Sequence, residues 1–553
     1  MCGIVGYAGN IETACGKPLE VCLQGLERLE YRGYDSAGVA LTAPGMDKVV
    51  VRKKAGRLKN LVEDIERKPM PLATVGIGHT RWATNGEPSD VNAHPHTSMD
   101  GKVAIIHNGI IENASQLRLD LQAEGYRFAS ATDTEVAAKL LGKIVDKIIA
   151  DEGKPDLFKA VRRMARMLEG AFTILATDCR QPDIVVGARH DSPLVVGLGE
   201  GENFLGSDVA AFVAYTKRAM EVDQDQAVCV SADKVIVTDF DGNVVENPKT
   251  YTVDWDASAA EKGGWDSFMD KEIHEDPAAV QRTLLGRFDT NGDITLDEVR
   301  IDEHDFKSID KIIVVACGTA SYAGQVAKYA IEHWVRIPVE IELAHEFRYR
   351  DPILTPRTLV VAISQSGETM DTLMALRHAR EQGSKVLAIC NTQGASIPRE
   401  SDAVLYTHAG PEVAVASTKA FVAQITAAYL LGLYLAQVKG AMFRDEIHQV
   451  LDSLKDMPRK IQWVLDTQPK TIQAAAERMV NANSFLFLGR HVGYPVALEG
   501  ALKLKEIAYT FTEGFAAGEL KHGPIALVDE GEPVVFIVPP QRSRNVLHAK
   551  VIS

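Results

Sequence analysis

The run Lys311-Ile312-Ile313-Val314-Val315-Ala316, followed by Cys317-Gly318-Thr319, determines the fold class predicted for the second half of this 553-residue chain. A short run of mostly β-branched apolar residues is typical of a strand buried on both faces. Two similar runs, 358–363 and 385–390, follow with helical segments between them. Strands that alternate with helices predict a parallel sheet covered by helices, an α/β fold.

A weaker copy of this pattern begins at Ser484-Phe485-Leu486-Phe487-Leu488-Gly489-Arg490 and continues through a helical run, 497–509, to a strand at 534–538. The match of 487–490 with 316–319 indicates an internal duplication. Because the sequence stops at Ser553, we expect the second copy to be incomplete.

Composition and charge exclude several classes of protein. The hydrophobic fraction is 46%, and 60 basic residues against 75 acidic ones give a net charge of −15. This charge argues against a nucleic-acid binder. Seven scattered cysteines, with no CxxC pair, indicate neither a disulfide framework nor a zinc ribbon. We expect a cytoplasmic protein without signal peptide or membrane span, since even the apolar run 421–435 is interrupted by Gln424.

Cys2 stands directly after the initiator. Removal of Met1 would give this residue both a thiol and a free α-amine, a nucleophile and a weak base within reach of each other. The alternative is a small residue at a processed terminus without any catalytic role.

Three polar patches accompany Cys2 in the first half. Arg81 and Trp82 stand side by side. Considered alone, Arg81 would form an ion pair at the rim and Trp82 would pack in the core. Asn108-Gly109 suits an oxyanion hole or a simple turn. Asp133, within 132–135, follows a typical helix N-cap. Taken singly, each patch favours the structural interpretation.

Together, in this order, Cys-Gly-Ile-Val-Gly, Arg-Trp-Ala-Thr, His-Asn-Gly and Thr-Asp-Thr-Glu resemble the class II glutamine amidotransferase domain, and the stretch 28–38 extends the resemblance. It implies an α+β Ntn-hydrolase fold, an αββα sandwich, in which Cys2 attacks the glutamine carboxamide. The implied oxyanion donors are the side chain of Asn108 and the N–H of Gly109. The implied glutamine-binding residues are Arg81 for the carboxylate, Asp133 for the ammonium, Trp82 as a gate on the ammonia route, and Thr84. Asn85 departs from the family's usual histidine.

The segment Ser364-Gln365-Ser366-Gly367-Glu368-Thr369 lies between a strand and a helix. Hydroxyls and helix N–H groups there predict a phosphate site, although a plain N-cap is the alternative. With 317–319, 417–419 and 498–523, this segment resembles the sugar isomerase (SIS) domain, a flavodoxin-like α/β fold. The resemblance implies that the phosphate is held by Ser364, Gln365, Ser366 and Thr369, and the sugar by Thr319, Ser417 and Glu499.

The stretch 498–506 resembles the catalytic helix of that family. Glu499, Lys503 and Glu506 lie at i, i+4 and i+7 on one face, which could also be a solvated, salt-bridged stripe. The resemblance implies Glu506 as the base that moves a proton between C1 and C2, with Lys503 on nearby oxygens. His522 matches a ring-opening acid/base that the family supplies across a subunit interface, so a homodimer through the SIS domains is implied.

The order of domains is similar to a family of two-site synthases that use L-glutamine to aminate and isomerise fructose 6-phosphate, with ammonia passed between the sites. The expected domains are a glutaminase at 1–241, a linker and start of the isomerase region at 242–305, and SIS domains at 306–445 and 446–553. No cofactor or metal is expected. Residues 289–293 resemble a calcium-binding loop, but the glycine stands at the wrong position for one, so we interpret this stretch as a surface turn. The family's C-terminal lysine has no match, which leaves a glutaminase with a non-catalytic sugar-phosphate module as the alternative.

Overall fold

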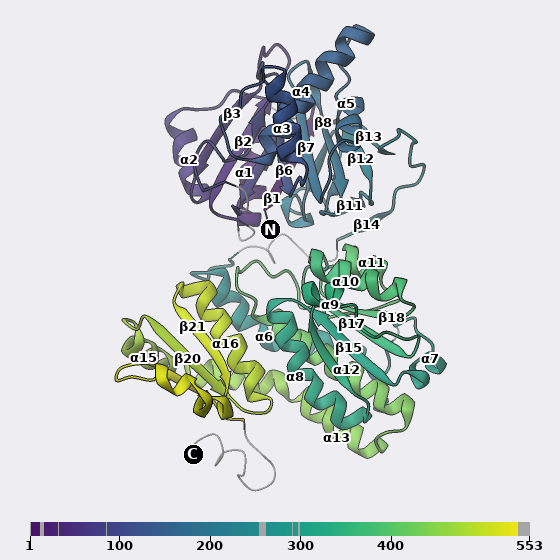
Figure 1. Ribbon diagram of the computed structural model, residues 1–553, viewed down its shortest axis with the longest axis vertical. Coiled ribbons are helices and arrows are strands. Elements are labelled where there is room, and N and C mark those ends of the chain that lie inside the picture. The colour runs from purple at the N-terminus through teal and green to yellow at the C-terminus, as the bar shows by residue number, and fades with distance from the viewer. Residues whose placement is uncertain are drawn as a thin grey trace. The chain divides into compact units, whose positions relative to one another are not determined.

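The structure, a computed structural model, describes residues 2–10, 16–30, 33–83, 86–253, 262–289, 291–296 and 299–539. The chain divides into two compact units, Met1–Glu261 and Lys262–Ser553 (Figure 1). Thr84 and Asn85 lie outside the described residues.

The first unit contains two antiparallel sheets. In spatial order the larger sheet consists of β14 (Thr250–Thr252), β11 (Arg218–Glu221), β9 (Val195–Leu198), β10 (Glu202–Gly206), β1 (Gly3–Gly9), β4 (Val75–Arg81), β2 (Ser36–Thr42) and β3 (Val50–Ala55). The smaller consists of β13 (Val235–Asp239), β12 (Gln226–Val230), β8 (Gln181–His190), β7 (Phe172–Asp178), β6 (Val103–Gly109) and β5 (His96–Thr97). The helices are α1 (Lys17–Leu29), α2 (Leu58–Arg67), α3 (Ala114–Ala123), α4 (Asp133–Glu152) and α5 (Leu157–Ala165).

Alternating side chains along the strands build four layers. Ile4 on β1 and Ile106 on β6 belong to one cluster between the two sheets. Val5 points to the other face, into the cluster with α1 and α2, and Ile105 lies in the cluster with α4 and α5. Since each sheet is buried on both faces, the predicted αββα sandwich is confirmed.

The first strand of the second unit's main sheet is β15 (Lys311–Ala316), as the apolar run 311–316 predicts. The spatial order is β16 (Val339–Leu343), β15 (Lys311–Ala316), β17 (Thr358–Ser364), β18 (Lys385–Cys390) and β19 (Ala403–Tyr406), all parallel. In chain order this is 2-1-3-4-5, the flavodoxin-like arrangement. The predicted α/β fold is therefore confirmed.

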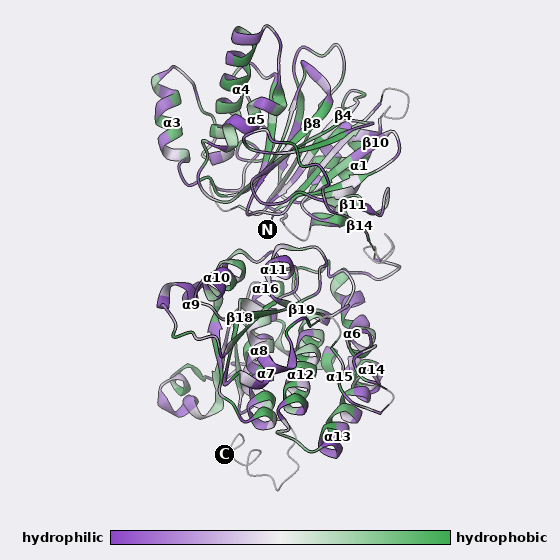
Figure 2. Ribbon diagram, turned by 90° about the vertical axis from the view of Figure 1, so that its right-hand side faces the viewer, coloured by the Kyte–Doolittle hydropathy of each residue, from purple (hydrophilic) through white to green (hydrophobic). Residues whose placement is uncertain are grey.

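Helices cover both faces of this sheet. Ile312 and Val314 pack with α8 (Gly318–Val335) and α12 (Lys419–Lys439), whereas Ile313 and Val315 pack with α9 (Ala344–Arg350), α10 (Met370–Glu381) and α11 (Ser396–Glu400). The central strands β15, β17 and β18 are accordingly mostly apolar and buried, whereas the edge strand β16 carries two glutamates. The outer helices carry hydrophilic faces (Figure 2).

A second, three-stranded parallel sheet follows in the order β21 (Phe511–Ala516), β20 (Ser484–Gly489), β22 (Val534–Ile537), with α16 (Gly493–Ala508) against it. This 2-1-3 order repeats the start of the first sheet, as the predicted duplication requires. Along the chain, the two sheets are separated by α13 (Arg444–Lys455), α14 (Met457–Thr467) and α15 (Pro469–Met479). The interval 242–305 contains β14, α6 (Phe268–Leu284) and the start of α7 (Glu303–Ser308).

One described helix, α12, is long and apolar enough to cross a bilayer by length and composition, which corrects the prediction that no stretch qualifies. The helix packs against α8 and α6, and 61% of its most apolar window is buried. Its apolar character therefore serves the core of the second unit.

Candidate functional site

Cys2 lies directly before β1, and its thiol contacts the backbone of Trp82. The Trp82 N–H donates to Cys2 Sγ over 3.2 Å, and the thiol lies 3.6 Å from the Trp82 carbonyl oxygen. Because β1 is antiparallel to β4, with Gly3 opposite Thr80, the start of one strand meets the end of the other. Burial raises the pKa of the Cys2 thiol, so a base has to remove its proton near neutral pH.

Asn108 and Gly109 end β6, in the facing sheet. Asn108 Nδ2 donates to the carbonyl oxygen of Cys2 over 2.8 Å, so the predicted amide donor lies beside the predicted nucleophile. Gly109 has φ +121°, and a Cβ at this position would lie 2.0 Å from the Ala171 carbonyl oxygen. Glycine is therefore required here, and its N–H ends the strand next to Asn108.

Arg81 is the last residue of β4 and is only 4% exposed. Its Nη2 donates to the carbonyl oxygen of Gly86 over 3.1 Å. Burial lowers the pKa of Arg81, while the charges of Cys2, Asp133 and Asp35 raise it. The guanidinium is thus within electrostatic reach of the nucleophile and of the predicted ammonium partner.

Asp133 begins α4, and the predicted N-cap is confirmed, since Thr132 Oγ1 accepts from the Glu135 N–H over 3.3 Å. Asp133 Oδ2 accepts from the Ile111 N–H over 3.0 Å, so the carboxylate also fixes the loop after β6. Trp82 is 43% exposed, and its ring meets that of Tyr34 edge-on with centroids 5.5 Å apart. An exposed tryptophan whose backbone contacts the thiol is compatible with the predicted gate.

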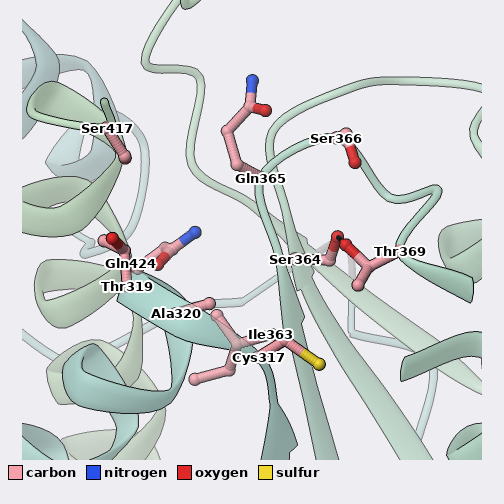
Figure 3. Close-up of a pocket in the computed structure, with 10 residues that line it drawn as sticks. All are labelled: Cys317, Thr319, Ala320, Ile363, Ser364, Gln365, Ser366, Thr369, Ser417 and Gln424. Atoms are coloured by element: carbon pink, nitrogen blue, oxygen red, sulfur yellow. Dashed lines mark hydrogen bonds between the residues drawn. The ribbon is translucent and has the colours of Figure 1, made fainter. Parts of the chain in front are cut away.

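Of the seven sugar-phosphate residues predicted from sequence, all but Glu499 line one cavity of about 170 Å³. In Figure 3, Thr319, Ser417 and Gln424 lie on one side, and Ser364, Ser366 and Thr369 on the other. The full lining is Cys317, Thr319, Ala320, Ile363, Ser364, Gln365, Ser366, Thr369, Ser417 and Gln424. The cavity opens where β15 and β17 end, which is the switch point of the 2-1-3-4-5 sheet and the usual ligand position in this architecture.

Hydroxyls and backbone N–H groups order the loop after β17. Ser364 Oγ lies 3.0 Å from Thr369 Oγ1 and accepts from the Gly367 N–H over 3.0 Å. Ser366 Oγ accepts from the Glu368 N–H over 3.2 Å. The loop leads into α10, whose N-terminus favours an anion.

Three side chains of α16 reach this cavity through Thr319. Lys503 Nζ donates to Thr319 Oγ1 over 3.0 Å and to Glu506 Oε2 over 2.7 Å, and it lies 3.4 Å from Glu499 Oε1. The Thr319 hydroxyl donates in turn to Glu499 over 3.1 Å. Burial raises the pKa of Glu499, which is 6% exposed, whereas Lys505 points to solvent. The three side chains share one face, as predicted; those of Glu499 and Lys503 are largely buried, whereas that of Glu506 is 32% exposed.

Comparison with known proteins also divides the chain into an amidotransferase part and an isomerase part. A family model for the glutamine amidotransferase domain matches residues 79–214, and one for the SIS domain matches 305–434 and 478–551. Glutamine–fructose-6-phosphate aminotransferases (isomerizing) from Corynebacterium diphtheriae and Corynebacterium efficiens are 62% and 63% identical over 100% of this chain and 88% of theirs. The chain belongs to this family.

The C-terminal domain of glucosamine-fructose-6-phosphate aminotransferase from Francisella tularensis is similar in structure, with a TM-score of 0.50 and 40% identity over 52% of this chain and 80% of that one. The two separate SIS matches also confirm the internal duplication inferred from 316–319 and 487–490.

The family resemblance implies that His522 acts across a subunit interface, and it is not among the lining residues of the cavity of its own chain. His522 ends a short 3₁₀ helix, Ala517–His522, and is exposed. Reasoning from sequence missed Gln424, which is 2% exposed and lines the cavity. Its position as a polar residue inside an otherwise apolar helix was the available signal.

One set of described side chains could hold a metal ion. Ligand atoms of Cys317, His345 and Asp371 lie within 4.8 Å of one another, and the last two residues are exposed. Cys317 also lines the sugar cavity.

Proposed function

We propose that this chain transfers the amide nitrogen of L-glutamine to fructose 6-phosphate and isomerises the product to glucosamine 6-phosphate. The contact network Glu499–Thr319–Lys503–Glu506 beside a hydroxyl-rich cavity is the observation that carries this proposal. Relatives named for this reaction match the whole length of the chain.

In the first step Cys2 Sγ attacks the glutamine carboxamide carbon, while the α-amine freed by removal of Met1 takes the thiol proton and returns it to the leaving ammonia. Asn108 Nδ2 and the Gly109 N–H stabilise the oxyanion. Arg81 binds the substrate carboxylate, Asp133 the ammonium. Water then releases glutamate from the thioester.

In the second step the ammonia condenses with the open-chain ketone at C2 of the sugar, and water leaves. Glu506 removes a proton from C1 of the imine and returns it to C2, while the proton of the C1 hydroxyl passes to the imine nitrogen, which gives the 2-amino aldose. Lys503 neutralises nearby oxygens, and Ser364, Ser366 and Thr369 bind the phosphate. We assign ring opening to His522 of a second subunit.

We further propose a cytoplasmic homodimer that binds neither nucleic acid nor membrane. The net charge of −15 supports the absence of nucleic acid. The six described cysteines are free, which suits a reducing compartment. An exposed His522 that does not line the cavity of its own chain supports a site that is shared between two subunits.

The decisive assay supplies glutamine and fructose 6-phosphate and measures glutamate and glucosamine 6-phosphate separately. We expect both products in equal amounts, and we expect neither from Cys2→Ala. Glutamate without aminosugar would contradict the synthase and favour a glutaminase with a non-catalytic sugar-phosphate module. Glutamate release by Cys2→Ala would show that the nucleophile is another residue.

A further inference from the structure

His79 lies on β4, two residues before Arg81, and is completely buried. Its Nε2 is 3.1 Å from Asn108 Oδ1 and 3.0 Å from the carbonyl oxygen of His107. The His107 oxygen can only accept a hydrogen bond, so His79 Nε2 has to carry the proton. Burial lowers the pKa of the imidazole to about 3, which keeps the ring neutral with one N–H.

This N–H determines which way the Asn108 amide points. With Oδ1 turned toward His79, Nδ2 faces the active site and donates to the carbonyl oxygen of Cys2 over 2.8 Å. If the amide were rotated by 180°, its N–H group would face the N–H of His79, and its oxygen would face the carbonyl oxygen of Cys2. An amide in that orientation would present oxygen, instead of N–H, to a developing oxyanion.

We propose that His79 is a positioning residue that holds the Asn108 amide in its donor orientation. This inference rests on the proposed function of Asn108 as an oxyanion donor. His79 touches neither the glutamine carboxamide nor Cys2 in this scheme, and it acts only through Asn108. The neutral ring keeps its N–H across the working pH range, so the device is insensitive to pH.

Neighbouring imidazoles supply a matched control. The ring of His94 packs on that of His79 with centroids 4.2 Å apart and is 5% exposed. His94 belongs to the same buried cluster but has no hydrogen bond to Asn108 among the described contacts. A change at His94 therefore tests the effect of disturbing the cluster alone.

The test compares His79→Leu, His79→Gln and His94→Phe in the full chain, with kcat and KM for glutamate release as readouts. We expect His79→Leu to lower kcat roughly 100-fold, as the loss of an oxyanion donor does, with KM changed less than about threefold. His79→Gln, whose amide N–H replaces Nε2–H, should recover most of this loss. His94→Phe should keep kcat within about threefold.

A double-mutant cycle separates positioning from general damage. In an Asn108→Ala background, His79→Leu should lower kcat no further, because the group it orients is gone. Alkylation of Cys2 by iodoacetamide forms no oxyanion, so its rate should be unchanged in His79→Leu. An additive loss in the double mutant, a parallel loss of alkylation, or an unchanged kcat in His79→Leu would overturn the inference. An unchanged kcat in Asn108→Ala alone would instead contradict the proposed role of Asn108.

Discussion

At the scale of single residues, Gln424 combines burial, an unsatisfied polar atom and a place in the sugar cavity. Its Oε1 has no hydrogen-bond partner among the described residues, although the side chain is 2% exposed. A buried amide oxygen without a partner destabilises the folded state. A sugar hydroxyl could donate a hydrogen bond to this oxygen. Sugar binding would therefore explain why a glutamine is buried here, which the contacts within the protein do not.

We therefore expect Gln424→Leu to change stability and affinity in opposite directions. Removing the unsatisfied oxygen should raise the melting temperature, while the loss of one hydrogen bond to the sugar, about 1 kcal/mol, should raise KM for fructose 6-phosphate roughly fivefold. Glutamate release should not change. Thermal unfolding and the two product assays measure these effects, and an unchanged KM would show that Gln424 does not contact the sugar.

Residue types and their order predicted much of the candidate glutaminase site, but not the contacts that arrange it. Cys2, Arg81 and Asn108 were recognised from short motifs, and the structure brings them together from the residue before β1 and from the ends of β4 and β6. The orienting role of His79 depends on which strands face each other across the sandwich. Asp35 likewise holds the segment after β4, since its Oδ2 accepts from the Ala83 N–H over 2.8 Å. Such contacts come from tertiary packing, which local sequence does not report.

At the scale of elements, prediction succeeded where burial produced a continuous apolar run. β15 spans the predicted 311–316, and β18 spans 385–390. β21 was missed because its sequence, Phe-Thr-Glu-Gly-Phe-Ala, contains a charge and a glycine, and the side chain of Phe511 is 64% exposed. A strand whose sequence is neither continuously apolar nor alternating gives no periodic signal. Its place in the sheet comes from its pairing with β20.

Helix α6 carries a pH-dependent contribution to stability. Burial raises the pKa of Asp276 to about 7, with Glu412, Glu272 and Glu275 adding to the shift and Lys419 opposing it. Burial also raises the pKa of Glu272 to about 7. Ordinary carboxyl groups in an unfolded chain titrate near pH 4, so the folded state holds more protons between about pH 4 and 7. Stability contributed by these groups therefore falls as the pH rises through this interval.

Asp276→Asn removes one of these ionisations with little change of shape. We expect it to raise the melting temperature at pH 8, where the wild-type carboxylate is charged, and to raise it less at pH 5. Thermal unfolding at the two pH values measures the difference. Glu381→Gln, an exposed site on α10, is the control and should shift neither value. An equal shift of Asp276→Asn at both pH values would contradict the assignment.

At the scale of the whole molecule, the candidate sugar site depends on both copies of the duplicated fold. Thr319 follows the first strand of the first copy, whereas Glu499 and Lys503 lie on the first helix of the second. The hydrogen bonds that join them, 3.1 and 3.0 Å long, link the two copies within the second unit. In the proposed site, one copy thus supplies the binding loop and the other the proposed acid–base groups. The remaining proposed group, His522, is exposed and absent from the cavity lining of its own chain.

Subunit complementation tests whether His522 acts from a second subunit. Glu506→Gln and His522→Ala should each release glutamate but form no aminosugar. If subunits of the two variants are mixed equally and exchanged, half of the dimers pair one with the other, and each pair contains one site with Glu506 and the partner's His522 intact. Aminosugar formation should then recover to about a quarter of the wild-type rate, since one site in two is active in half of the dimers. If both groups acted within one chain, mixing would restore nothing, because every site would lack either the base or the ring-opening acid.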